Sequence, residues 1–198
     1  MRSQLPALAL IAALGAACPT VAAAGGEVVF ARGHATLVTK GGRTVRAAKG
    51  QAVGPGDLVR TGQGQLQLQF PDGTYVSLAP GSDLRVDAYR YSAHSNGQDV
   101  AFFTLYRGGA RCLTGAIAQT PVARFRVNTP YGTVHASAAE FSALVGDSLQ
   151  ISLGAGYAEV RNQAGTLRLA AGQRGFVRDR TAPPILVGTI VPAPVTPR

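Results

Sequence analysis

Cysteine and histidine are the residue types best suited to nucleophilic or metal chemistry, and this sequence has two cysteines and three histidines. Cys112 follows Arg111, whose positive charge could lower the pKa of the thiol. No histidine is placed by the sequence to act as its base, because His34, His94 and His135 are scattered. None of the three has a second histidine or cysteine three to five residues away, which is the spacing typical of a zinc site. Cys112 is therefore interpreted as a buried structural residue, and a thiol-dependent enzyme is the less favoured alternative.

Other catalytic signatures are not found in the sequence. There is no Gly-x-Ser-x-Gly elbow, and Gly62-Gln-Gly64 lacks the lysine of a phosphate-binding loop. The ten acidic residues include no close pair beyond Asp83 and Asp87. The sequence therefore predicts a protein that is not an enzyme and that has neither a cofactor nor a metal site.

Arginine dominates the basic residues, and its distribution is uneven. The formal net charge is +9, and seventeen of the nineteen basic residues are arginine. No acidic residue occurs between positions 101 and 139, whereas Arg107, Arg111, Arg124 and Arg126 do. Guanidinium groups bind carboxylates and phosphates in a bidentate manner, so these four residues are candidate ligand-binding residues for an acidic glycan or peptidoglycan. The other interpretation is a solvated basic face.

The N-terminus has the pattern of an export signal. Arg2 is the only charge in the first 26 residues, and residues 5–14 form an apolar run that is too short to span a membrane. We expect a signal peptide over residues 1–24 with cleavage after Ala24, and therefore a periplasmic or secreted protein without a transmembrane segment. Export, together with the lack of an aromatic and basic stacking motif, argues against a nucleic-acid partner.

Cys18 suggests an alternative in which the exported chain carries a lipid. Lipid-modified cysteines normally follow a leucine three residues earlier, but that position is Gly15 here, and Leu14 lies one residue too far back. Cleavage after Ala24 is the favoured interpretation.

Alternating apolar and polar residues place these candidates on β-strands. Residues 66–70 and 75–78 predict a hairpin around the turn Pro71-Asp72-Gly73-Thr74, and residues 141–145 and 149–153 predict a second hairpin. Residues 112–119 could form one short helix or a loop. The other expected strands cover residues 27–30, 34–39, 84–87, 100–106, 125–128, 133–136, 158–161, 166–169 and 175–178.

The predicted fold is all-β. The 198 residues are enough for one domain, 46% of them are hydrophobic, and 25 glycines and 12 prolines interrupt any long helix. We expect a single domain of short antiparallel strands and tight turns over residues 25–182, either similar to a β-solenoid or β-roll or a sandwich. Residues 183–198 are rich in proline and form a tail that is either disordered or an extended strip lying on the domain.

An internal repeat is visible around three glycines. An apolar residue, two spacers, a glycine, one spacer and an alanine recur around Gly33, Gly108 and Gly156. Two of the copies later close with Gly50-Gln51 and Gly172-Gln173. The pattern predicts a strand that bends at a glycine and packs a small alanine where two backbones come close, unless the recurrence is coincidental in a chain rich in both residues.

The turns between residues 50 and 86 resemble those of the FecR domain family. A Gly-Asp, a Thr-Gly and an Asp-Gly-Thr occur in the family's order at Gly56-Asp57, Thr61-Gly62 and Asp72-Gly73-Thr74. The resemblance covers residues 44–175 and implies a β-solenoid-like fold. From the residue types, we interpret these seven positions as a structural turn motif, because glycine adopts left-handed turns and aspartate caps backbone N–H groups.

The resemblance also implies a role in envelope sensing and signalling through contacts with an envelope protein. The transmembrane members of the family carry a sigma-factor-binding segment and a membrane helix, whereas this chain resembles the stand-alone exported members. It departs from the family at Ser137-Ala138-Ala139, where Arg-Gly-Thr is frequent. The alternative function is a structural or glycan-binding envelope module that uses the basic face.

Overall fold

The structure is a computed structural model that describes residues 25–92, 98–119 and 124–189. The expected signal peptide with Ala24 and Cys18, and also His94, lie outside these ranges. The last nine residues of the expected tail lie outside them as well.

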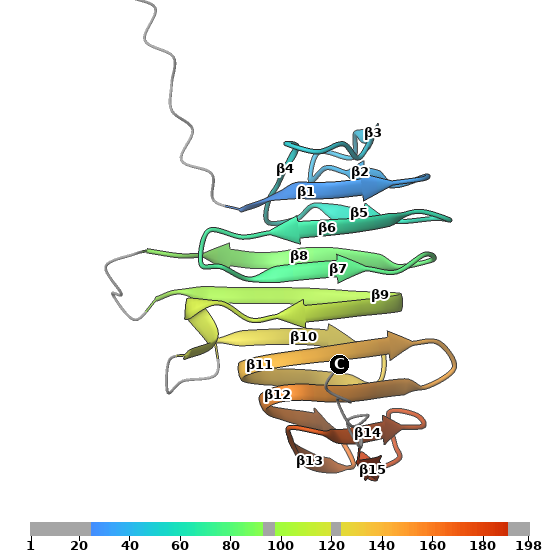
Figure 1. Ribbon diagram of the computed structural model, residues 1–198. Helices are drawn as coiled ribbons and strands as arrows, with labels where there is room; N and C mark the ends of the chain where they lie inside the picture. Colours follow the sequence, from blue (N-terminus) through green and yellow to red (C-terminus); the bar gives the residue numbers. More distant parts are fainter. Residues whose placement is uncertain (1–24, 93–97, 120–123, 190–198) are drawn as a thin grey trace, which may run out of the picture.

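Fifteen strands and one 3₁₀ turn make up the described part of the chain, so the all-β prediction is confirmed (Figure 1). The elements are β1 (Gly26–Arg32), β2 (Thr36–Val38), β3 (Thr44–Arg46), β4 (Ala52–Val53), β5 (Leu58–Arg60), β6 (Gln65–Gln69), β7 (Tyr75–Leu78), β8 (Asp83–Arg90), β9 (Val100–Leu113), η1 (Ala116–Gln119), β10 (Phe125–Thr129), β11 (Gly132–Val145), β12 (Leu149–Asn162), β13 (Gly165–Ala170), β14 (Gln173–Val177) and β15 (Ile185–Thr189). Every predicted strand overlaps a strand of the structure, the short strands β3, β4 and β5 were not predicted, and the expected helix or loop over residues 112–119 contains the 3₁₀ turn.

The hydrogen-bonded strands form one continuous sheet that folds over on itself into two layers. The first layer runs β4, β1, β6 and β7, then the second halves of β9 and β11, the first half of β12, β14 and β15. The second layer runs β3, β2, β5 and β8, then the first half of β9, β10, the first half of β11, the second half of β12 and β13. The three long strands β9, β11 and β12 therefore belong to both layers.

Strand length and direction differ in part from the sequence prediction. Residues 133–136 and 141–145 were expected as separate strands, but both lie in β11, because the chain bends at Ala138 without leaving the sheet. The prediction of antiparallel pairing is wrong at one place, where β10 runs parallel to β9. This parallel pairing follows from the connection through η1, which crosses from the first layer back to the second.

The glycines of the internal repeat lie at the bends where the chain passes between layers. Gly33, Gly108 and Gly156 all have positive φ, at 76°, 82° and 74°. A Cβ on Gly156 would lie 2.1 Å from the carbonyl oxygen of Ala138, and one on Gly108 would lie 2.5 Å from Ser82. The predicted bends and close backbone approaches are thus confirmed, and the alanine two residues after each glycine is buried.

The two ends of the molecule are built from similar units. From β1 to β4 the chain runs through one layer, bends, forms a hairpin in the other layer and returns, and from β12 to β14 it does the same. Gly50 and Gly172 both have positive φ where the chain returns. The side chains of Gln51 and Gln173 each accept a hydrogen bond from the backbone N–H three residues earlier, at 3.2 and 2.8 Å.

The core lies between the two layers and contains a row of aromatic rings. Phe70 and Phe141 come from the first layer, and Phe103 and Phe125 come from the second. The ring centroids are 5.2 Å apart for Phe70 and Phe103, 5.6 Å for Phe103 and Phe125, and 6.3 Å for Phe125 and Phe141. These contacts join the layers along the length of the molecule.

β15 adds a strand that the sequence analysis did not expect. It lies within the stretch assigned to the tail and pairs with β14, so the sheet continues to Thr189. Its residues are exposed, including Ile185, Leu186 and Val187.

Candidate interaction surface

The residues of the predicted turn motif hold the turns together with hydrogen bonds that range from exposed to fully buried. Gly56 has a φ of 92°, and the two carboxylate oxygens of Asp57 accept hydrogen bonds from the backbone N–H groups of Lys40 and Gly54, both at 2.8 Å. Asp57 thus connects its own turn to the hairpin between β2 and β3.

Thr61 works together with Ser82, which the sequence analysis missed. The Thr61 hydroxyl donates to the carbonyl of Ala79 at 2.6 Å and accepts from the backbone N–H of Ser82 at 2.8 Å. The Ser82 hydroxyl in turn accepts from the N–H of Gly109 at 3.0 Å. Both side chains are fully buried, so they satisfy backbone groups at the bend that contains Gly108.

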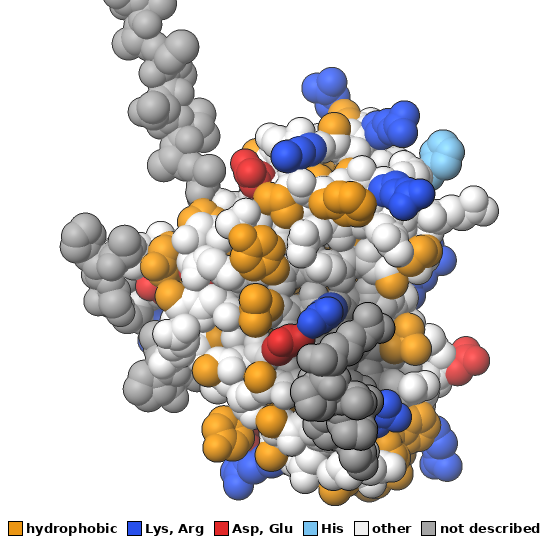
Figure 2. All heavy atoms as spheres, viewed as in Figure 1, with side chains coloured by type: hydrophobic (Ala, Val, Ile, Leu, Met, Phe, Trp, Pro, Cys, Tyr) orange, Lys and Arg blue, Asp and Glu red, His pale blue; other side chains and the backbone are white. Residues whose placement is uncertain are grey.

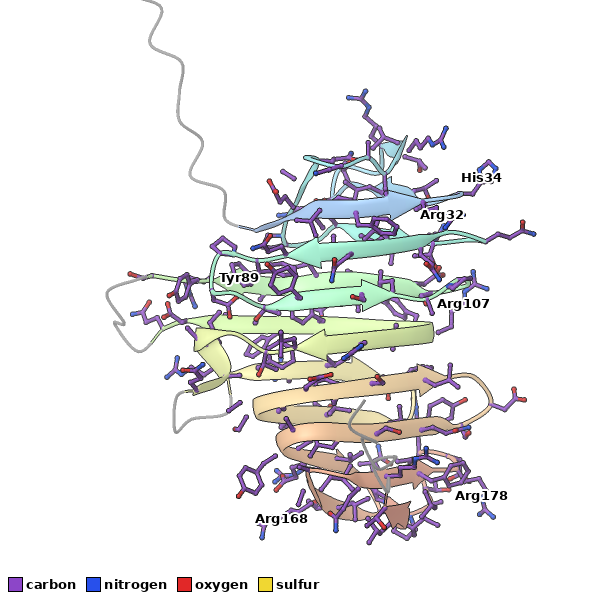
Figure 3. All side chains as sticks on the ribbon, viewed as in Figure 1. Arg32, His34, Tyr89, Arg107, Arg168 and Arg178 are labelled. Atoms are coloured by element: carbon purple, nitrogen blue, oxygen red, sulfur yellow. The ribbon has the colours of Figure 1, made fainter. Side chains whose placement is uncertain are left out.

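Asp72 and Thr74 form the corresponding network at the opposite edge of the molecule. Asp72 accepts hydrogen bonds from the Thr74 hydroxyl at 2.8 Å and from the Tyr89 hydroxyl at 3.0 Å. The Thr74 hydroxyl accepts from the N–H of Gly115 at 3.0 Å. Figure 3 places Tyr89 near one edge and Arg32, His34 and Arg107 at the other. The motif residues therefore brace the two edges of the fold.

Cys112 lies in the core on the inward side of β9 and is 1% exposed. Burial raises the pKa of its thiol to about 12, so the thiol is protonated at neutral pH. Arg111 does not offset this effect, because successive side chains of a strand point to opposite faces. A buried, protonated thiol fits the structural interpretation.

The four candidate arginines do not come together in one site. Arg111 points outward from the first layer and pairs with Glu140, whereas Arg126 points outward from the second layer. The guanidinium of Arg126 lies over the Phe102 ring at 3.8 Å, and Arg107 pairs with Asp83 at 3.1 Å. Arg124 lies just before β10, on the second layer. Since the core separates the two outer faces, a single ligand does not meet Arg111 and Arg126 together.

Charged side chains elsewhere are also largely paired or located at the ends of the molecule. In Figure 2 the blue side chains gather at the two ends, and white and orange side chains prevail between them. On the second layer, Glu159 pairs with Arg161 at 2.6 Å and with Arg168 at 3.3 Å. Within the described ranges, no group of three or more His, Cys, Asp or Glu side chains lies close enough together to hold a metal ion. No helix in those ranges is long and apolar enough to cross a membrane.

A trough of about 560 Å³ lies on the outer face of the first layer. Its floor follows one row of cross-strand neighbours, in which each residue lies directly opposite the next. We call this surface the serine trough. The row consists of Phe30, Gln67, Ser77, Arg111, Ser142 and Ser152.

The serine trough is hollowed where its lining carries short side chains. Ala79 and Gly109 lie in the lining with Ser77 and Ser142. The exposed Phe30 stands at the β1 end of the row, and the exposed Leu144 also lines the trough. Outward positions on a sheet normally carry long polar side chains, so a floor of Ser, Ala and Gly leaves room for another chain to lie close to the backbone. The sequence analysis missed this surface, because the serines come from β7, β11 and β12, and only strand register aligns them.

Comparisons with known proteins identify relatives of the sequence and of the fold. A family model described as FecR protein matches residues 57–159. No curated protein sequence matches the chain. The structure is similar to a crystal structure of a predicted anti-sigma factor from Parabacteroides distasonis, with 19% identity and a TM-score of 0.52 over 67% of this chain and 59% of that one. A second crystal structure of a predicted anti-sigma factor from the same organism has 19% identity and a TM-score of 0.49, over 63% of this chain and 55% of that one.

Proposed function

Because this chain belongs to the FecR family, we propose that it is a non-catalytic signalling module of the bacterial cell envelope that acts by binding another protein. The chain spans less than two thirds of the length of the neighbouring structures. We therefore propose a general role in signalling for it and do not assign it their specific partners. Export by the expected signal peptide is part of the same proposal.

The serine trough is the observation that supports binding of a protein. It offers hydroxyl and amide groups and two exposed apolar side chains, and its one charged floor residue, Arg111, is paired with Glu140. An extended, uncharged polypeptide segment fits such a surface, because its backbone can approach the short floor and its apolar side chains can contact Phe30 and Leu144. The buried Cys112 and the structural hydrogen bonds of Asp72 and Asp57 give no support to a catalytic role.

The proposal is tested in the native host by deleting the gene and complementing it with variants. We expect deletion to change the transcript profile and the unaltered chain to restore it. Ser142→Arg, which blocks the trough, should fail to restore it, while Thr166→Arg on the exposed face of β13 should succeed. Both variants are first checked for equal amounts in the envelope fraction and for equal melting temperatures. An unchanged transcript profile on deletion, or equal complementation by the two variants, would overturn the proposal.

A further inference from the structure

A second hollow lies on the outer face of the second layer, across the core from the serine trough. It has a volume of about 500 Å³ and is lined by residues of β11, β12 and β13. Strand register aligns its floor, because His135 lies opposite Glu159 and Glu159 lies opposite Arg168. Tyr157 and Arg161 flank Glu159 along β12 on the same face, at the period of two that a strand imposes. We call this surface the arginine hollow.

The surroundings of the arginine hollow are positively charged. From β10 to β13 this face carries three arginines and one acid, which are Arg126, Arg161, Arg168 and Glu159. Arg126 is not in the lining, but it lies opposite His135 on the next strand, so it adds charge beside the hollow. A concave surface with an excess of positive charge attracts an anionic ligand.

Glu159 fixes two arginines and leaves part of their hydrogen-bonding capacity unused. Its carboxylate oxygens accept hydrogen bonds from Nη2 of Arg161 at 2.6 Å and from Nε of Arg168 at 3.3 Å. Burial opposes its ionisation, but these two hydrogen bonds outweigh burial and hold the pKa of Glu159 below its ordinary value. Within the described ranges the two terminal nitrogens of Arg168 have no hydrogen-bond partner, and the side chain is 87% exposed. A carboxylate can therefore bind end-on to this planar fork.

Tyr157 gives the hollow an exposed aromatic wall. The residue is 71% exposed, and its cross-strand neighbours are the small residues Ser137 and Ala170, which leave its ring uncovered. An aromatic ring that is open to solvent suits the apolar C–H face of a sugar ring, since tyrosine combines an apolar ring with a polar hydroxyl. Ser137 also lines the hollow and offers a hydroxyl that can bond to a sugar hydroxyl.

We propose that the arginine hollow binds an acidic polysaccharide whose sugars carry carboxylates. The carboxylate of one sugar meets the fork of Arg168, and the ring of the sugar lies on Tyr157. An acidic polypeptide offers the same carboxylates but no ring with an apolar C–H face, so the exposed tyrosine favours the sugar. The two arginines of the site, Arg161 and Arg168, are not among the sequence candidates. The proposal adds a ligand on the second layer and does not rest on the protein partner proposed for the first.

Isothermal titration calorimetry on the full chain tests the proposal. The probes are an oligomer of galacturonic acid and an oligomer of mannuronic acid, both at physiological ionic strength. Polyglutamate is the control for charge without sugar rings, and dextran is the control for sugar rings without charge. We expect binding of a uronate oligomer, affinity for polyglutamate that is lower by about 10-fold or more, and no binding of dextran.

Variants of the hollow separate a specific site from general attraction to a basic surface. Arg168→Gln should weaken binding by about 10-fold or more, because hydrogen bonds to a carboxylate are lost. Arg168→Lys should lose nearly as much, because it keeps the charge but loses the planar fork. Tyr157→Ser should weaken binding by about 5-fold, because it removes the aromatic wall.

Arg85→Gln and Tyr106→Ser are the matched controls on the same face. Arg85 also pairs with an acid, Asp87, and it lies over the Tyr106 ring. In its cross-strand row it is four strand spacings from Arg161, or about 19 Å. Charges are screened over about 8 Å at physiological salt, so each control should change the affinity by less than ~2-fold.

Three results would overturn the proposal. Equal losses in the hollow variants and the controls would replace the site with a diffuse basic face. Equal affinity for polyglutamate would point to an acidic protein segment, and failure of both uronate oligomers to bind would leave no ligand of this class. Melting temperatures first confirm that each variant is folded. The titration uses no protein partner, so its outcome is independent of the deletion experiment that tests the proposed function.

Discussion

The buried carboxylate of Asp72 accepts several hydrogen bonds and has a structural role. Burial, above all, holds the pKa of Tyr89 above its ordinary value, so the Tyr89 hydroxyl stays protonated and donates to Asp72. Asp72→Ala leaves the donors of Thr74 and Tyr89 buried without an acceptor, and we expect a loss of about 3 kcal/mol in the free energy of unfolding. Urea denaturation followed by circular dichroism measures it.

Asp57→Ala is the matched control for that prediction. Asp57 also accepts two hydrogen bonds, but it lies nearer to solvent, so water can replace the carboxylate. The expected loss is about 1 kcal/mol. Equal losses for the two variants would contradict the distinction between the buried and the half-buried network.

Cys112 should resist alkylation in the folded protein. Its thiol is buried, and its pKa of about 12 leaves almost no thiolate at pH 8. We expect iodoacetamide to modify it only after unfolding in urea, as measured by intact-mass spectrometry. Modification of the native protein at the rate of an exposed cysteine would instead support the thiol-dependent alternative.

His135 makes the stability of the protein sensitive to mild acid. Burial lowers its pKa below the ordinary value of 6.5, and the charges of Arg161 and Arg126 add to this effect, with Glu159 opposing them. The unfolded chain therefore binds the proton first, and stability that is complete above pH 6.5 falls as the pH drops toward the lowered pKa. His135→Gln should show a smaller loss of stability between pH 7.5 and pH 5.5 in urea denaturation, and an equal loss would contradict this assignment.

At the scale of elements, the bend of β11 makes a departure from the family pattern costly. The family resemblance places a glycine at position 138, but this chain has Ala138, with a φ of 44°. This left-handed conformation costs an alanine about 1 kcal/mol. Ala138→Gly should therefore stabilise the protein by about that amount, as measured by urea denaturation.

Gly146 supplies the control for this glycine substitution. It lies in the turn between β11 and β12, and a Cβ there would meet no atom within 4 Å. Its backbone is not among those with positive φ, so Gly146→Ala should change the free energy of unfolding by about 0.5 kcal/mol or less, toward greater stability. A loss of stability in Ala138→Gly would show that the bend is not strained.

At the scale of the whole molecule, the row of aromatic rings predicts that the two layers unfold together. Phe103 is fully buried and contacts Phe70 of the first layer and Phe125 of the second. Phe103→Ala should cost about 4 kcal/mol, because it removes these contacts and leaves a cavity. The transitions followed by circular dichroism and by tyrosine fluorescence should still coincide, and two separate transitions would mean that the layers are independent.

Most of the strands, turns and bends could be predicted from local patterns in the sequence. The hairpin around Asp72-Gly73 and the bends at Gly33, Gly108 and Gly156 could be predicted, because a turn or a bend depends on the φ and side chain of the residue itself. β15 was missed, because its pairing with β14 stabilises a strand that a proline-rich composition disfavours. The parallel pairing of β9 and β10 was missed for a similar reason, since a crossover between layers has no local signature.

The sequence by itself determined the all-β class, the turn motif and the family, since these depend on alternation and on glycine and aspartate at fixed spacings. Tertiary structure alone decided what the surface can do. It placed Arg111 and Arg126 on opposite faces, although they are only fifteen positions apart, because the chain crosses between layers between them. It also aligned Ser77, Ser142 and Ser152 into one trough, because the register of strands that are distant in sequence is set by packing of their buried faces.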